Sequence, residues 1–171
     1  FEGQVEFLKI GHDNYPWGQE EKLGKGCAEI FYDLVNIPYI KRFEEFYYER
    51  DPKEEKRVYD KLNPNDEEYI FVHDDASRGY PIDDDRVFEY NDGKEIKIIR
   101  NDMSENLFFY GMILEKAKQI HCMESSFRSI VEILDTTDEL YFHSFRTEAY
   151  VGNSTRREWK EVPYTEWSAM K

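Results

Sequence analysis

Short continuous runs of apolar residues alternate with amphipathic segments between about residues 68 and 144, and this alternation restricts the fold more than any other feature. The clearest run is Tyr69-Ile70-Phe71-Val72, which is typical of a strand covered on both faces. Three more strands are expected around residues 96–99, 120–123 and 140–142. Strands that alternate with helices form parallel sheets. We therefore predict an α/β fold, with a Rossmann-like, mainly parallel sheet flanked by helices.

Helices are expected between these strands and before them. Ser104 is placed to cap a helix over 105–118, and Ser125 or Ser126 is placed to cap the next one. Asp51-Pro52 is typical of an N-cap followed by proline at the first helical position, in a helix that ends near Leu62. The other expected elements are a strand over 5–10, helices over 27–35 and 40–48, and a strand or helix around Trp159, Val162 and Trp167.

The expected helices and strands divide the chain into two parts. Residues 1–66 form an irregular and helical segment that packs on the core. Residues 67–171 form the Rossmann-like core with its C-terminal tail.

Charge and composition exclude several classes of function. The chain has 171 residues, with 37 acidic against 23 basic side chains and a formal charge of −14. This acidity argues against binding to nucleic acid or to an anionic membrane surface, because both call for a broad basic face. No run of about 18 apolar residues is present, so no membrane span is expected. Cys27 and Cys122 are expected to provide one or two reduced, buried thiols of a cytoplasmic protein.

The first candidate site directly follows the apolar run at 69–72. The segment reads His73-Asp74-Asp75-Ala76-Ser77-Arg78-Gly79-Tyr80. Ligands of parallel α/β sheets bind beyond the carboxyl ends of the strands, where this segment lies. Arg78 beside Gly79 suits a phosphate group, and His73 suits proton transfer or hydrogen bonding to an anion. The alternative is a structured turn in which Asp74 or Asp75 caps local amides.

Two further polar segments are expected at the same edge of the sheet. Glu124-Ser125-Ser126 opens an amphipathic helix and suits an anion, although an ordinary serine N-cap has the same pattern. His143 follows the strand at 140–142 and is either a site residue or a structural histidine. His121, inside a predicted strand, is expected to be structural, and His12 is a weaker candidate.

Several familiar sites are absent from the sequence. It contains no GxGxxG loop, no Walker P-loop and no GxSxG elbow. The four histidines are widely scattered, so no metal site is expected. The acidic run Asp83-Asp84-Asp85 is expected to be a solvated turn.

The segments at 69–80 and 120–127 resemble a family of bacterial and viral glycosyltransferases. Residues 30–32, 42–51 and 140–143 fit the same pattern, so the resemblance covers about residues 27–146. A polar loop with an arginine after a strand, followed later by a Ser-Ser helix start, is more distantly similar to the GDP-fucose-using fucosyltransferases of the GT-B fold. The fucosyltransferases place more than one basic residue in the first loop, whereas Arg78 stands among acidic residues.

The resemblance implies the nucleotide-sugar-binding half of a two-lobed, metal-independent enzyme, like the C-terminal lobe of a GT-B glycosyltransferase. Arg78 would neutralise the diphosphate of the donor, and Ser125 and Ser126 would donate hydrogen bonds to it. His73 and Tyr80 would contact the donor nearby, and Glu124 and His143 complete the expected donor site. The chain is short for a complete GT-B enzyme, so an N-terminal lobe or a partner chain is expected to complete it.

The function expected from these observations is sugar transfer from a nucleotide-diphosphate sugar to a glycan or small acceptor, with no cofactor. The catalytic base is unassigned among His73, Asp74 and Asp75, with Glu124 as a further carboxylate. The alternative is a non-catalytic α/β interaction module that kept the fold without activity, and a phosphotransferase is a third reading. An ion pair of Arg78 with Asp74 or Asp75 away from any cleft would favour the module.

Overall fold

The computed structural model of the chain describes residues 15–17, 20–145 and 155–164. Two compact units divide the chain. One comprises 1–46 with 146–156, and the other comprises 47–145 with 157–171. The second unit carries the sheet and begins before the helix at Asp51-Pro52, so that helix belongs with the sheet.

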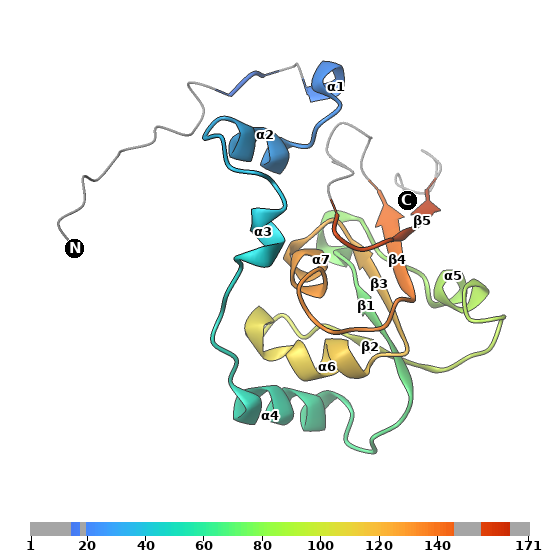
Figure 1. Cartoon of the computed structure of the whole chain (residues 1–171). Coiled ribbons are helices and arrows are strands. Elements are labelled where there is room, and N and C mark those ends of the chain that lie inside the picture. The colour runs from blue at the N-terminus through green and yellow to red at the C-terminus, as the bar shows by residue number, and fades with distance from the viewer. Residues whose placement is uncertain (1–14, 18–19, 146–154, 165–171) are drawn as a thin grey trace. The chain divides into compact units, whose positions relative to one another are not determined.

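The sheet has five strands, and all of them run parallel (Figure 1). They are β1 (Tyr69–His73), β2 (Lys97–Arg100), β3 (Gln119–Met123), β4 (Leu140–Ser144) and β5 (Lys160–Pro163), in the spatial order β2-β1-β3-β4-β5. The predicted Rossmann-like α/β fold is confirmed. After β1 the chain adds β2 on one side and then returns to add β3 on the other. The carboxyl ends of β1 and β3 therefore mark the switch point where such sheets bind ligands.

The central strands follow from their apolar sequences. Every residue of β1 and of β3 is buried, as expected for strands that helices or loops cover on both faces. The segment around Val162, which was expected to be a strand or a helix, is the strand β5. Trp167 lies outside the described residues.

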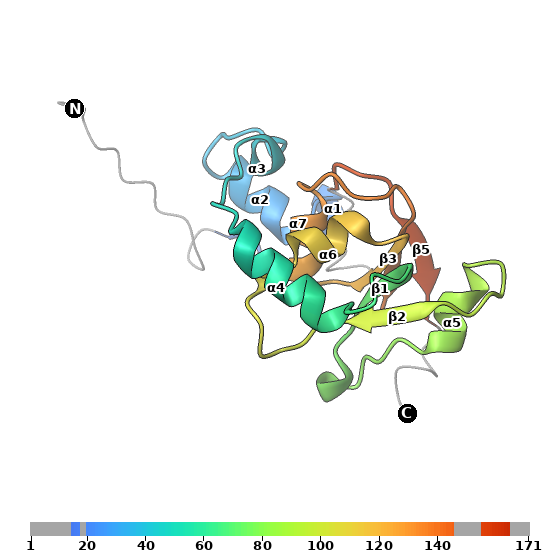
Figure 2. The same ribbon diagram turned by 90° about the horizontal axis from the view of Figure 1, so that it is seen from below.

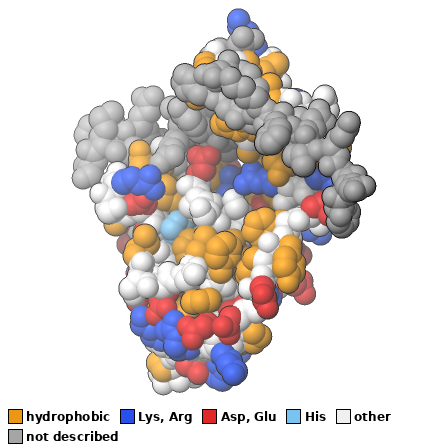
Figure 3. Space-filling view, turned by 90° about the vertical axis from the view of Figure 1, so that its left-hand side faces the viewer, with side chains coloured by type: hydrophobic (Ala, Val, Ile, Leu, Met, Phe, Trp, Pro, Cys, Tyr) orange, Lys and Arg blue, Asp and Glu red, His pale blue; other side chains and the backbone are white. Residues whose placement is uncertain are grey.

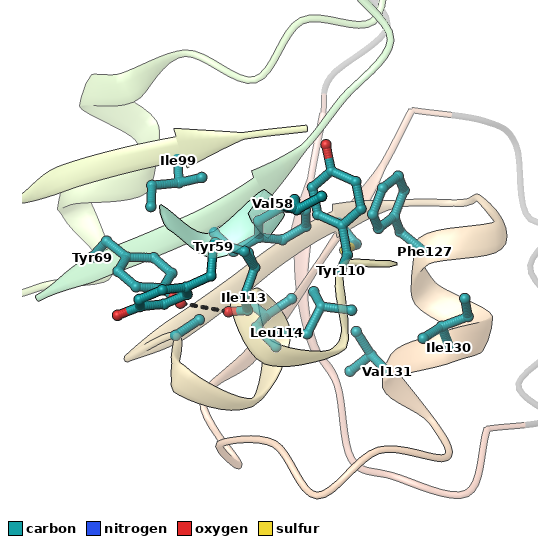
Figure 4. Close-up of a cluster of buried hydrophobic side chains, with 14 of the residues drawn as sticks. Val58, Tyr59, Tyr69, Ile99, Tyr110, Ile113, Leu114, Phe127, Ile130 and Val131 are labelled. Atoms are coloured by element: carbon teal, nitrogen blue, oxygen red, sulfur yellow. Dashed lines mark hydrogen bonds between the residues drawn. The ribbon is translucent and has the colours of Figure 1, made fainter. Parts of the chain in front are cut away.

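Three helices pack on one face of the sheet and form the main core (Figure 2). They are α4 (Pro52–Leu62), α6 (Gly111–Lys116) and α7 (Ser126–Val131). Figure 4 shows their apolar side chains meeting Tyr69 and Ile99 of the sheet. The Tyr69 hydroxyl donates a hydrogen bond of 2.7 Å to the carbonyl oxygen of Ile113, which satisfies a buried polar group inside this core.

The opposite face carries α5 (Asp84–Glu89) and a smaller apolar cluster of Ile70, Val72, Ile82 and Val87. The expected solvated turn at Asp83–Asp85 is wrong. Asp83 is the N-cap of α5, and the next two aspartates fill its first turn. Carboxylates there interact favourably with the free amides and the dipole of a helix start.

The helix predicted after Asp51-Pro52 is confirmed as α4. The Asp51 carboxylate accepts hydrogen bonds from the backbone amides of Lys53 and Glu54, at 3.0 and 3.2 Å. Pro52 at the first helical position loses no hydrogen bond, because that amide has no partner within the helix.

The single helix predicted over 105–118 is wrong. A 3₁₀ turn, η2 (Leu107–Phe109), comes first, and α6 covers only Gly111–Lys116. Asn106, rather than Ser104, caps η2 by accepting from the amide of Phe108 at 3.0 Å. The Ser104 hydroxyl donates instead to Asp102, which holds it in the preceding turn.

The first unit contains the short helices α1 (Glu20–Leu23), α2 (Cys27–Asp33) and α3 (Lys41–Glu44). The helix expected over 40–48 ends at Glu44, and the strand expected over 5–10 lies outside the described residues. Aromatic rings stabilise this unit, with Tyr39 edge-on to both Tyr32 and Phe43. Both cysteines are free thiols, and Cys122 is buried whereas Cys27 is exposed, so one of the two is a buried thiol.

Candidate functional site

A cleft of about 590 Å³ opens at the carboxyl ends of β1, β2 and β3. Its walls come from the three segments that follow these strands. The lining residues are 73–78 at and after the end of β1, 124–127 after β3, and, at and after the end of β2, Arg100, Asn101, Asp102, Met103, Glu105 and Leu107. The switch point of the sheet and the cleft therefore coincide.

The segment after β1 is a tight turn built around Asp75. Its carboxylate accepts from the Ser77 hydroxyl at 2.6 Å and from the Arg78 amide at 3.2 Å, and so caps the 3₁₀ turn η1 (Ala76–Arg78). Gly79 has a φ of 83°, a left-handed conformation that glycine adopts without steric cost. Backbone hydrogen bonds between Asp75 and Tyr80 close the turn. The turn that we named as the alternative is therefore present, and it forms a wall of the cleft.

Arg78 forms an ion pair at the rim of this cleft. Its Nε donates to the Asp75 carboxylate, and its side chain is 63% exposed. Its two terminal nitrogens make no hydrogen bond to any residue that the structure describes. The outer edge of the guanidinium is thus open to a ligand, although its charge is shared with Asp75.

Asp74 and Arg100 hold the turn to the neighbouring strand. The Asp74 carboxylate accepts from the Ile82 amide at 3.0 Å and from Arg100 at 2.6 Å. Arg100 also donates to the Ile82 carbonyl oxygen and to Asp84. Both terminal nitrogens of Arg100 are therefore occupied, and this side chain has a structural role.

Ser125 and Ser126 stand at the start of α7. Ser125 is the N-cap residue, but its side chain makes no capping hydrogen bond. Its Oγ is buried and has no hydrogen-bond partner in the described structure. The Ser126 hydroxyl likewise makes no hydrogen bond to a described residue, and both serines line the cleft together with Glu124. A buried hydroxyl without a partner costs free energy, so a ligand that bonded to Ser125 would recover it.

His73 ends β1 with its imidazole at the base of the cleft. The ring is 8% exposed and packs against Phe127, with ring centroids 4.5 Å apart. Its Nδ1 lies 2.8 Å from Oδ1 of Asn101. Burial lowers the pKa of His73, while the Asn101 hydrogen bond and the charges of Asp74 and Asp75 oppose that shift. His73 is therefore neutral at pH 7.

Two further carboxylates of the cleft have partners on α4. Lys61 donates to Asp102 and to Glu105, each at 2.7 Å, and Arg57 donates to Glu105 at 2.6 Å. Hydrogen bonds from Lys61 and Ser104 hold the pKa of Asp102 well below its ordinary value. Such pairing of opposite charges recurs on the molecular surface, where Figure 3 shows acidic and basic side chains lying next to each other.

Two predicted site residues lie elsewhere. Tyr80 is not a lining residue, and its ring packs 5.5 Å from that of Phe145. His143 is 1% exposed and bonds to His121 and Tyr164. β4 continues two residues beyond the expected end at residue 142 and so includes His143, and strand alternation points its side chain to the face opposite the main core. His121 is fully buried, as expected of a structural residue.

The sequence interpretation missed the cleft residues at and after the end of β2. Arg100, Asn101 and Asp102 all line the cleft. The same rule that singled out His73 and Glu124 would have found them, because they directly follow the strand marked by Ile98 and Ile99.

Comparisons with protein-family models, with curated proteins and with solved structures found no match to this chain. Among the described residues, no helix has both the length and the apolar character needed to cross a membrane. Within the same residues, no three His, Cys, Asp or Glu side chains are grouped so that they could hold a metal ion.

Proposed function

We propose that the cleft binds a nucleotide-diphosphate sugar and that the chain is a glycosyltransferase, or the donor-binding domain of one. The observation that carries this proposal is the meeting of His73, Arg78, Ser125 and Ser126 around one cleft at the switch point of the sheet. Those residues come from segments about fifty positions apart, and the resemblance implied that they share a donor site.

The chemistry of the lining suits both parts of such a donor. The open edge of the Arg78 guanidinium would pair with the diphosphate, and the hydroxyls of Ser125 and Ser126 would donate to its oxygens. Glu124 lines the same cleft and would accept hydrogen bonds from ribose or sugar hydroxyls. Met103 is 85% exposed at the cleft and offers an apolar surface to a base or sugar ring.

In the proposed reaction an acceptor hydroxyl attacks the anomeric carbon of the sugar. The bond from that carbon to the diphosphate breaks, and its electron pair leaves with the nucleoside diphosphate. Arg78 and the two serine hydroxyls would stabilise the charge that grows on this leaving group. The acceptor is a glycan or a small molecule, and the reaction uses neither a metal ion nor a cofactor. The two free cysteines favour a reducing, cytoplasmic location.

A second candidate is an interaction module without activity, and the ion pairs of the cleft favour it. Arg78 is bonded to Asp75, and Arg100 is held by Asp74 and Asp84. Five carboxylates line the cleft with these two arginines, namely Asp74, Asp75, Asp102, Glu105 and Glu124. A diphosphate would have to overcome this excess of negative charge.

Calorimetry with GDP, UDP, ADP, dTDP, CMP and their sugar conjugates, with and without magnesium, separates the two candidates. The proposal expects one diphosphate to bind without metal, and Arg78→Ala to weaken that binding at least about tenfold, the worth of a charged hydrogen bond. Lys56→Ala is the matched control, because Lys56 is 64% exposed, pairs with one carboxylate and lies outside the cleft. A folded protein that binds no member of the panel would favour the interaction module.

A further inference from the structure

We propose that His73 accepts the proton of the acceptor hydroxyl through its Nε2 atom, and that Asn101 is the positioning residue that keeps this atom unprotonated. This inference deepens the proposed glycosyl transfer and rests on it for the identity of the reaction. It assigns a base among groups that the sequence left unranked, and it gives a role to a residue that the sequence interpretation missed.

The hydrogen bonds of Asn101 determine which nitrogen of His73 carries the proton. The Asn101 Nδ2 atom donates to the Met103 sulfur at 3.0 Å, so its Oδ1 atom faces His73. An amide oxygen can only accept a hydrogen bond, so the Nδ1 atom of His73 must donate. In a neutral imidazole the Nε2 atom then carries a lone pair.

That lone pair is available to a ligand. The Nε2 atom of His73 has no hydrogen-bond partner among the described residues, while the side chain lines the cleft. The packing of the ring on Phe127 and the bond to Asn101 fix its orientation from two sides. An oriented imidazole with one free basic nitrogen is the arrangement that general bases share.

Asp74 and Asp75, the two other candidates for the catalytic base, already accept hydrogen bonds from other groups. Asp74 is bonded to the Ile82 amide and to Arg100. Asp75 receives hydrogen bonds from Ser77 and Arg78, and these bonds lower the pKa of its carboxyl, which makes it a poorer base. Neither carboxylate can accept a proton without weakening the turn that forms the cleft wall.

The proton balance of the step is simple. The acceptor O–H bond breaks, its oxygen bonds to the anomeric carbon, and the proton moves to the Nε2 atom of His73. The resulting imidazolium keeps its Nδ1–H bond to Asn101 and later releases the new proton to water. The charged residues that line the same cleft are Asp74, Asp75, Arg78, Arg100, Asp102, Glu105 and Glu124.

The tautomer is measurable without any substrate. Long-range ¹H–¹⁵N correlation spectra of the ¹⁵N-histidine-labelled protein at pH 7 should show His73 protonated at Nδ1. Asn101→Ala should move His73 to a mixture with the Nε2–H form, and Asn101→Asp should restore the Nδ1–H form because a carboxylate also accepts. Asn106→Ala removes an asparagine that caps η2 but is not itself a lining residue of the cleft, and it should leave His73 unchanged. An Nε2–H signal for His73 in the unmodified protein overturns the inference.

Turnover of the nucleotide sugar that binds in the calorimetric panel tests the base itself. His73→Gln should lower kcat about 100-fold or more, and Asn101→Ala about 10- to 100-fold, each with little change in KM. Asn101→Asp should recover activity but move the acidic limb of the pH profile upward by about one unit or more, because a charge replaces a neutral acceptor. A purely structural role for Asn101 would not shift that limb.

The outcomes keep the two proposals apart. A donor that binds while the Asn101 and His73 variants keep their kcat overturns this inference and spares the proposed function. A protein that binds no donor overturns the proposed function, and with it the catalytic role of His73, even where the spectra show the Nδ1–H form.

Discussion

Glu55 is a buried carboxylate on α4, and its side chain is only 2% exposed. Arg50 neutralises it through two parallel hydrogen bonds, Nε to Oε1 at 2.7 Å and Nη2 to Oε2 at 2.5 Å. The same guanidinium donates to Glu115 of α6, so it joins the two helices. A buried charge of this kind is tolerated only while its partner is present.

Removing Arg50 should therefore lower the free energy of unfolding by more than the loss of an ion pair on the surface does. We expect Arg50→Met to lower the free energy of unfolding by about 3 kcal/mol, at the low end for a broken buried pair because Arg50 itself is one-third exposed. Urea titration followed by circular dichroism measures this change. Lys56→Ala, which breaks an exposed pair on the same helix, should change stability by less than about 0.5 kcal/mol. A loss below about 1 kcal/mol for Arg50→Met would show that water already solvates Glu55.

Between elements, Gly111 allows α6 to approach α4 closely at this ion pair. A Cβ atom built on Gly111 would lie 2.6 Å from Nη2 of Arg50 and 2.7 Å from Oε2 of Glu55. These distances are shorter than any normal contact, so one of the two side chains would have to move. The buried Glu55 has little room to do so.

Gly111→Ala should lower the free energy of unfolding by about 1–3 kcal/mol, because overpacking outweighs the higher helix propensity of alanine. The double variant Arg50→Met with Gly111→Ala tests the cause. Its loss of stability should be smaller than the sum of the two single losses, since part of the clash disappears with the guanidinium. Additive losses would mean that the added methyl group acts elsewhere.

The sequence predicted the elements whose own residues determine them. β1 and β3 follow from apolar runs that can only be buried, and α4 follows from its aspartate cap and proline. The prediction of one helix over 105–118 was wrong. The apolar residues have helical spacing, but the backbone does not follow one continuous α-helix. Asn106 starts a 3₁₀ turn, and Tyr110 then breaks the helical path with a ψ near 0°. Local hydrogen bonds of this kind leave no mark on hydrophobic periodicity.

The location of the cleft was predictable from the sequence, but the residues that line it were only partly predictable. The rule that ligands bind at strand ends located the segments at His73 and at Ser125. It could not tell that strand alternation turns His143 to the other face, because the predicted end of β4 was two residues short. It also could not tell which carboxylates were already paired, because the partners of Asp102 and Glu105 come from α4, more than forty residues away.

For the molecule as a whole, a buried polar chain crosses the second face of the sheet. The Nε2 atom of His143 lies 2.9 Å from Nδ1 of His121, and the Nδ1 atom of His143 lies 2.7 Å from the Tyr164 hydroxyl. At the other end, Gln119 turns its amide nitrogen to the Tyr90 carbonyl oxygen, so its Oε1 atom faces His121. Donors and acceptors therefore alternate from Tyr164 through His143 and His121 to Gln119 when both histidines are neutral.

A proton added to His121 would set its Nδ1–H against the Nε2–H of His143, and a proton added to His143 would set its Nδ1–H against the Tyr164 O–H. Burial lowers the pKa of both His121 and His143 to about 3, with the neighbouring imidazole and Arg86, respectively, acting in the same direction. The pKa of an unfolded histidine is about 6.5. The groups that face the pair are Arg86, Tyr90, Gln119, Tyr141 and Tyr164, and none of them is an anionic partner at pH 7.

Below about pH 6.5 the unfolded chain binds protons at these two histidines that the folded chain does not bind. The free energy of unfolding therefore has its full value above about pH 6.5 and decreases as the pH falls toward 3. Between pH 7 and pH 5 each histidine should lower the free energy of unfolding by about 2 kcal/mol, so the pair should lower it by about 4 kcal/mol. Carboxylates contribute little in this window, since their unfolded pKa values lie near 4. Urea titrations at pH 7, 6 and 5 measure the loss, and His143→Gln should remove the share of that histidine, about 2 kcal/mol. A free energy of unfolding that stays constant from pH 7 to pH 5 would mean that the folded protein accepts the protons and rearranges this chain.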